Sequence, residues 1–169
     1  MAKSLPITAN RALLLPVRNT VVKMVALCAA AATSTLEVFD GVFGTIATIA
    51  VGAAGTGYTA LDVLTLVSAS SGVQATVRVD TVDVGGEILT VTLLSGGTGY
   101  LAGSTYATTG GTGSGGTITA STVTDGTLMA KLSCVANENA PPTELCALST
   151  LGISVRITGT NAKGHLYYD

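Results

Sequence analysis

Few residues of this chain are of the types that perform catalysis. His165 is the only histidine, so any base-activated serine or cysteine nucleophile would depend on it. It lies between Gly164 and Leu166 in a strand-like terminal segment that contains no nucleophile motif. Asp80 and Asp83 could form a glycosidase-type carboxylate pair, but their odd separation on a strand points them to opposite faces. We therefore predict no catalytic residue and no enzyme activity.

Cofactor motifs are equally weak. Gly111, Gly113 and Gly116 satisfy the spacing of a dinucleotide-binding loop, but Thr117–Ser121 after them reads as a strand, whereas that loop must open a helix. A calcium site made of Asp62, Asp80 and Asp83 lacks any loop spacing that supports it. These sequences predict neither a bound cofactor nor a metal ion.

The three cysteines, Cys28, Cys134 and Cys146, are odd in number and include no C-x-x-C pair. A zinc site needs about four closely arranged nitrogen or sulfur ligands, which this spacing does not offer. Reduced, buried thiols in a protein made in a cytoplasm are the favoured interpretation. A Cys134–Cys146 disulfide is the alternative.

Composition limits the partners. Charged residues make up 11% of the chain and the net charge is −2, without a basic run, which argues against direct nucleic-acid binding because phosphate neutralisation needs clustered Lys and Arg. A surface this poor in charge is typical of a protein that packs against others. Residues 41–61 carry no charge but are interrupted by five glycines, and residues 21–32 are short and contain Lys23. We expect no membrane span.

The most informative pattern is an internal repeat. Residues 46–58 read IATIAVGAAGTGY, and residues 88–100, 42 positions later, read ILTVTLLSGGTGY. Repetition of this kind defines a structural unit. Tyr58 and Tyr100 hold equivalent positions, and we predict that each ring packs against the following hairpin with its hydroxyl bonded, forming the same corner twice. Contact with a host sugar or receptor is the alternative role.

The elements that hold these residues read as strands. Alternation of Val73, Ala75, Val77 and Val79 with polar residues predicts a strand over 73–82. Glycines at 85 and 86 then predict a hairpin turn. Further strands are expected within 12–15, 21–27, 34–39, 88–94, 117–121, 127–134, 152–159 and 165–168. The alanines at 29–32 are too few to nucleate a helix, so we expect a turn or a short strand there and very little helix overall.

The repeat is predicted to interrupt another domain. Deleting residues 41–124 joins STLEVFD to DGTLMAKLSC, which reads as a strand, an Asp-Gly turn and a strand. Hairpin tips tolerate insertions because they carry few buried backbone bonds. We predict an all-β protein with a jelly-roll-like β-sandwich base, residues 1–40 and 125–169, and an inserted small all-β repeat module, residues 41–124.

Residues 1–20 contain Pro6 and Pro16, which disfavour helix and central strand alike. We predict an extended N-terminal arm whose spaced cations, Lys3, Arg11 and Arg18, contact a neighbouring subunit or a capsid surface. A frayed terminus is the alternative.

The joined outer segments resemble small virion proteins of tailed bacteriophages, in Thr35–Gly41, Leu128–Cys134 and Gly152–Asp169. The Gly-Thr-Gly-Tyr repeats at Gly55–Tyr58 and Gly97–Tyr100 resemble those of phage tail, fibre and head-decoration proteins. The resemblance implies β-sandwich folds, usually trimeric, without a cofactor.

It also implies a virion protein, made in the host bacterial cytoplasm, that decorates the capsid by binding the major capsid protein. The alternatives are a tail, head-fibre or host-recognition component that binds a surface glycan and, from another class, a polysaccharide-acting enzyme.

Overall fold

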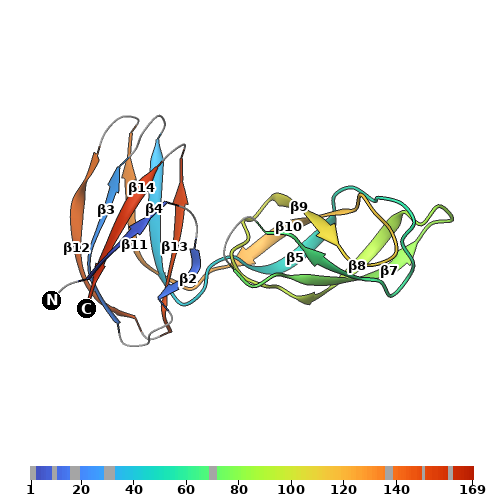
Figure 1. Ribbon diagram of the computed structural model, residues 1–169, viewed down its shortest axis with the longest axis horizontal. Helices are drawn as coiled ribbons and strands as arrows, with labels where there is room; N and C mark the ends of the chain where they lie inside the picture. Colours follow the sequence, from blue (N-terminus) through green and yellow to red (C-terminus); the bar gives the residue numbers. More distant parts are fainter. Residues whose placement is uncertain are drawn as a thin grey trace. The chain divides into compact units, whose positions relative to one another are not determined.

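A computed structural model of the chain describes residues 3–8, 11–15, 20–28, 33–68, 72–135, 139–149, 151–159 and 162–169, and of 11–15, 20–28 and 139–149 it gives the backbone. Fourteen strands and no helix are formed by these residues (Figure 1). The predicted all-β class is confirmed. The alanines at 29–32 and Arg18 lie outside the described residues.

The chain forms two compact units. One contains residues 1–43 and 125–169, which we call the base, and the other contains residues 44–124, which we call the repeat module. The sequence pattern predicts divisions at 40/41 and at 124/125. The structure places the first three residues later, because Gly41 and Val42 bond within the base: Gly41 N donates to Gly152 O (2.7 Å), and Val42 O accepts from Gly126 N (2.7 Å).

The base is a β-sandwich of two antiparallel four-stranded sheets (Figure 1). One sheet has the order β1-β14-β3-β12, and the other has the order β11-β4-β13-β2. The strands are β1 (Lys3–Ile7), β2 (Arg11–Leu15), β3 (Thr20–Cys28), β4 (Ser34–Asp40), β11 (Thr127–Cys134), β12 (Asn139–Ser149), β13 (Ile153–Thr158) and β14 (Lys163–Tyr168).

Alternating side chains fill the space between the two sheets. Leu36 and Val38 of β4 are fully buried, as the period-two pattern of this segment predicts. They pack with Ile153 and Val155 of β13 and with Leu166 of the facing sheet. The predicted pairing of the segment before the repeat with the segment after it is also confirmed, because β4 and β11 are antiparallel partners from Asp40↔Thr127 to Ser34↔Cys134.

The predicted N-terminal arm is wrong for the strands that the structure describes. β1 pairs with β14 along its length, from Lys3↔Tyr168 to Ile7↔Gly164, and β2 pairs with β13. Both strands lie at sheet edges, where a proline is tolerated because one side of the strand needs no ladder bonds. Pro6 therefore signalled an edge strand and not an unpaired arm.

The repeat module is a single antiparallel sheet of six strands in the order β5-β10-β9-β6-β7-β8. They are β5 (Thr45–Val51), β6 (Val63–Leu66), β7 (Thr76–Val82), β8 (Ile88–Ser95), β9 (Ser104–Thr109) and β10 (Thr117–Thr124). The sheet curls until its edge strands meet, where Ile46 N of β5 donates to Gly96 O (3.0 Å) beside β8. The module is therefore close to a barrel around its own core.

The strand order of the module follows the repeat. The first copy contributes β5, β6 and β7, and the second contributes β8, β9 and β10 at equivalent positions. The first strand of each copy does not pair with its own copy: β5 pairs with β10, and β8 pairs with β7. The order therefore reads the same from either end when the two copies are interchanged, which is the signature of an approximate two-fold axis through the middle pair, β6 and β9.

Candidate functional site

Tyr100 forms one corner of the repeat module. Its side chain is completely buried, and its hydroxyl donates to Leu66 O (2.9 Å) and accepts from Ala75 N (2.7 Å). Burial raises the pKa of the hydroxyl above its ordinary value, although the bond from Ala75 lowers it in part. The ring of Tyr106 meets it edge-on, with centroids 4.8 Å apart. The two hydrogen bonds hold the second copy against the first, whereas the ring contact lies within the second copy.

Tyr58 forms the equivalent corner. It is 3% exposed, and its hydroxyl accepts from Gly116 N (3.1 Å) in the second copy. The glycine-rich turn is shaped around this ring: a Cβ on Gly113 would sit 2.5 Å from Tyr58 Cγ, and one on Gly116 would sit 2.8 Å from the hydroxyl oxygen. Two glycines of the G-x-G-x-x-G match therefore make room for an aromatic ring, and β10 follows them where a dinucleotide site needs a helix.

The structure buries both repeat tyrosines and bonds both hydroxyls. The ring of Tyr100 meets Tyr106 of β9, in the hairpin that follows it. The sequence did not indicate that each hydroxyl bonds the other copy, Tyr58 to Gly116 and Tyr100 to Leu66 and Ala75. The rings are buried, so neither tyrosine offers an open aromatic face on which a sugar could stack.

Asp62 accepts hydrogen bonds that form a second contact between the copies. Its carboxylate accepts from Thr112 N (3.0 Å), Thr112 Oγ1 (2.7 Å) and Thr59 N (3.0 Å). These hydrogen bonds, that from the Thr112 backbone first, lower the pKa of Asp62 to about 2. The carboxylate joins the turn before β6 to the loop between β9 and β10.

The other two acidic residues considered as ligands have separate structural roles. Asp80 accepts from Thr92 Oγ1 (2.6 Å) and from Arg78, and these bonds lower the pKa of its carboxyl group. Asp83 accepts from Gly85 N and Glu87 N, both at 2.8 Å, and so shapes the turn between β7 and β8. No group of His, Cys, Asp and Glu suited to a metal ion occurs among the described residues.

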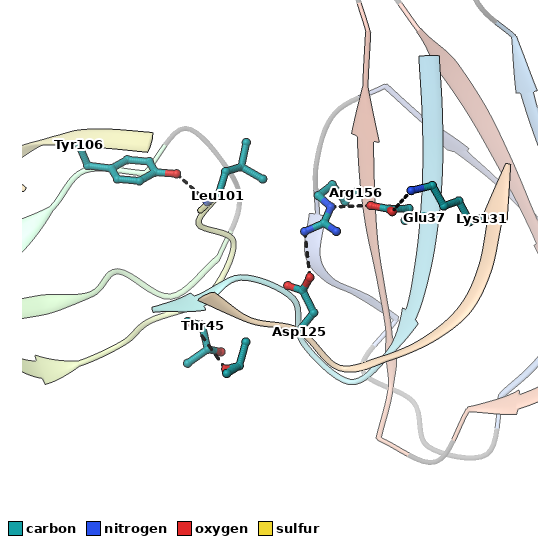
Figure 2. A network of polar contacts seen from close by, with 8 residues as sticks. Glu37, Thr45, Leu101, Tyr106, Asp125, Lys131 and Arg156 are labelled. Carbon is teal, nitrogen blue, oxygen red and sulfur yellow. Dashed lines mark hydrogen bonds and ion pairs between the residues drawn. The ribbon is translucent and has the colours of Figure 1, made fainter. Parts of the chain in front are cut away.

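The base carries a network of charges that sequence reasoning missed (Figure 2). Arg156 Nε donates to Glu37 Oε2 (2.7 Å), Lys131 Nζ lies 2.9 Å from Glu37 Oε1, and Arg156 Nη1 donates to Asp125 Oδ2 (3.0 Å). Burial alone would raise the pKa of Glu37, but the bonds from Lys131 and Arg156 outweigh it and lower that pKa. The alternation of apolar and polar residues could have indicated this network, because β4, β11 and β13 each carry a charged residue at a position that faces away from the core.

Strand register assembles this network. Glu37 is the cross-strand partner of Lys131 on one side and of Arg156 on the other, so side chains of three adjacent strands meet on one face. The guanidinium of Arg156 also lies over Phe39 and Phe43, 5.1 Å and 5.9 Å from the ring centroids, which is within cation–π range. The network fixes the place where the chain leaves the base after β4 and returns before β11.

The predicted interface cations are not brought together as an arm. Lys3 is exposed on β1, Arg11 begins β2 in the other sheet, and Arg18 lies outside the described residues. His165 is exposed on β14, with its ring centroid 6.3 Å from that of Tyr167. Cys134 is a buried free thiol, whereas the side chains of Cys28 and Cys146 lie outside the described residues.

Within the part of the chain that the structure describes, no helix has the length and hydrophobicity to cross a bilayer. Comparison of the chain with protein-family profiles, with curated proteins and with solved structures finds no match.

Proposed function

We propose that this protein is a non-enzymatic structural component of a tailed-bacteriophage virion, namely a capsid decoration (cement) protein. In this proposal the base binds the lattice of the major capsid protein, as a homotrimer, and the repeat module faces the medium. The protein needs no cofactor and contacts neither nucleic acid nor membrane directly.

The observation that carries the proposal is the strand order of the base. When its strands are counted from one to eight along the chain, the sheets read 1-8-3-6 and 5-4-7-2. This is the order of a jelly roll, a double-sheet fold used by viral capsid and lectin domains. This order supports the proposal that the base is a jelly roll and that the module is an insertion in the hairpin between its fourth and fifth strands.

The stabilising mechanism is burial repeated over a lattice. Standard protein interfaces bury about 1,200–2,000 Å², so many copies strengthen a shell even when each contact is weak. A chain with 11% charged residues pays little desolvation for such contacts. Internal DNA pressure would then be resisted by added contacts between capsid subunits.

Counting and locating the protein on particles tests this role. Purified virions of the phage that encodes the chain are analysed by quantitative mass spectrometry and by antibody labelling in the electron microscope. Hundreds of copies on the head support decoration. A few copies at the tail or on fibres would instead establish the tail or host-recognition alternative, and absence from the particle would overturn both.

Docking can be tested with one charge reversal and a matched control. Deleting residues 1–12 would remove β1 and the start of β2, so a point change is cleaner. If Lys3 belongs to the docking surface, Lys3→Glu lowers the occupancy of heads stripped of this protein. Lys163→Glu, at another exposed lysine of the same sheet, leaves it unchanged. Equal binding by both variants would remove Lys3 from the proposed surface.

A further inference from the structure

We propose that each repeat copy is a binding partner for a second copy of itself, so that the repeat module is a two-fold dimer joined into one chain. A chain that contains only one copy is therefore expected to bind a second chain that contains the same copy. This inference concerns the module alone and does not depend on the capsid role.

The first line of support is that one copy cannot form its sheet alone. In the first copy only β6 and β7 pair with each other, and β5 pairs with β10 of the second copy. In the second copy only β9 and β10 pair with each other, and β8 pairs with β7 of the first. Each copy therefore leaves its first strand to be completed by the other, and an isolated two-stranded hairpin is at best marginally stable.

The second line is the register at the centre of the sheet. Leu66 of β6 lies opposite Thr108 of β9, and these positions are 42 residues apart, the spacing of the repeat. Equivalent residues can face each other in this way only beside a two-fold axis. A pair of identical copies would place Leu66 opposite Leu66, as an isologous interface requires.

The third line is that contacts between the copies are reciprocal. Gly44 O accepts from Tyr100 N (3.0 Å), and Gly86 O, 42 positions later, accepts from Tyr58 N (3.0 Å). The core contains matching residues from both copies, including Ile46 with Ile88 and Tyr58 with Tyr100. A self-complementary interface makes each contact twice, and these contacts are made twice.

The connection between the copies is short and lies at one end of the sheet. β5 begins beside the end of β10, with Thr45 opposite Thr124, whereas β7 ends beside the start of β8. Because the strands are antiparallel, these two places lie at opposite ends of the sheet. A one-copy chain therefore cannot return to its own base directly, but a second chain would provide the missing strand partner and a second base.

The experiment removes one copy from the full chain. Deletion of residues 84–124 joins Asp83 to Asp125, and sedimentation equilibrium and circular dichroism report the mass and fold. We expect a β-rich assembly that contains twice as many chains as the assembly formed by the same protein without residues 44–124, because each copy recruits a second copy whatever the oligomeric state of the base.

A single cysteine then reports the symmetry, in a background whose three native cysteines are replaced by alanine. In the one-copy chain, Leu66→Cys is expected to form a disulfide with its own counterpart, giving a covalent dimer under mild oxidation. Thr48→Cys, an exposed residue of β5 away from the axis, serves as the matched control and is expected to cross-link far less.

A symmetrised chain tests whether the first copy can pair with an identical copy when both are in one chain. It therefore distinguishes a copy that cannot recruit a separate partner from a copy that cannot pair with itself at all. Residues 86–124 are replaced by a second copy of residues 44–83, and this chain is expected to fold with the intact module's stability. A folded symmetrised chain beside a monomeric or aggregated one-copy chain would overturn the proposal, because the copy then fails to recruit its partner. Failure of both chains would overturn it as well, since the copies would not be interchangeable.

Discussion

A single backbone angle shows how closely the two repeat copies match. Leu61 is a non-glycine residue with a positive φ of +75°, and the equivalent position of the second copy is Gly103, with φ +74°. A Cβ atom strains this left-handed conformation by about 1–2 kcal/mol because it crowds the following carbonyl oxygen, whereas glycine adopts the conformation freely. The first copy therefore stores strain where the second copy does not.

Exchanging these two residue types should change stability in opposite directions. We expect Leu61→Gly to stabilise the module by roughly 0.5–1 kcal/mol, because the relief of strain exceeds the added freedom of glycine in the unfolded chain. Leu61 is 70% exposed, so little burial is lost. Gly103→Ala should destabilise it by about 1 kcal/mol, since a Cβ there meets nothing within 4 Å and only the backbone is strained. Urea unfolding measures both, and changes of the same sign would contradict this account.

At the scale of elements, strands were the predictable part. The alternation of Ala75, Val77 and Val79 predicted β7, and all three side chains are fully buried. Val73 was assigned to the same buried face, but it precedes the strand and is 67% exposed. Periodicity identifies a strand and its inner face, whereas it says little about the ends of the strand.

Loops tie these strands together through Asp62, and this contact makes the module sensitive to acid. Folding lowers the pKa of Asp62 from 3.8 to about 2. The ionised carboxylate therefore contributes stability that is fully present above about pH 4 and is lost as the pH falls through 2.

Asp62→Asn tests this dependence. We expect the difference in urea midpoint between the natural chain and the variant to shrink between pH 4 and pH 2, and to be constant between pH 5 and pH 7. Other carboxylates titrate in both proteins and cancel in the comparison. A constant difference down to pH 2 would show that the charge of Asp62 does not stabilise the fold.

For the whole molecule, the base and the module have separate cores. The buried cluster of the base and that of the module share no residue, and the chain enters and leaves the module where β5 and β10 are paired. Such an arrangement allows an insertion to be removed with little loss to its host.

Excision of residues 44–124, joining Phe43 to Asp125, should leave a folded base. The pairing of β4 with β11 and the contact of Glu37 with Arg156 lie wholly within it. We expect a cooperative urea transition and retained β-type circular dichroism. Hydrogen exchange supplies the contrast: protection of the β4 amides in the intact chain that vanishes after excision would mean that the base depends on the module.

The sequence by itself determined the all-β class, the positions of most strands and the pairing of β4 with β11, because side-chain alternation and glycine turns act locally. It did not reveal that β1 belongs to the sandwich, since proline marks an edge strand and an unpaired segment alike. Only the tertiary structure decided which strands are partners. Hydrogen-bonded ladders join backbone segments that are far apart in sequence, so most strand partners cannot be predicted from local patterns. The sequence repeat indicated two similar copies, and the structure shows that the first strand of each copy pairs with the other copy.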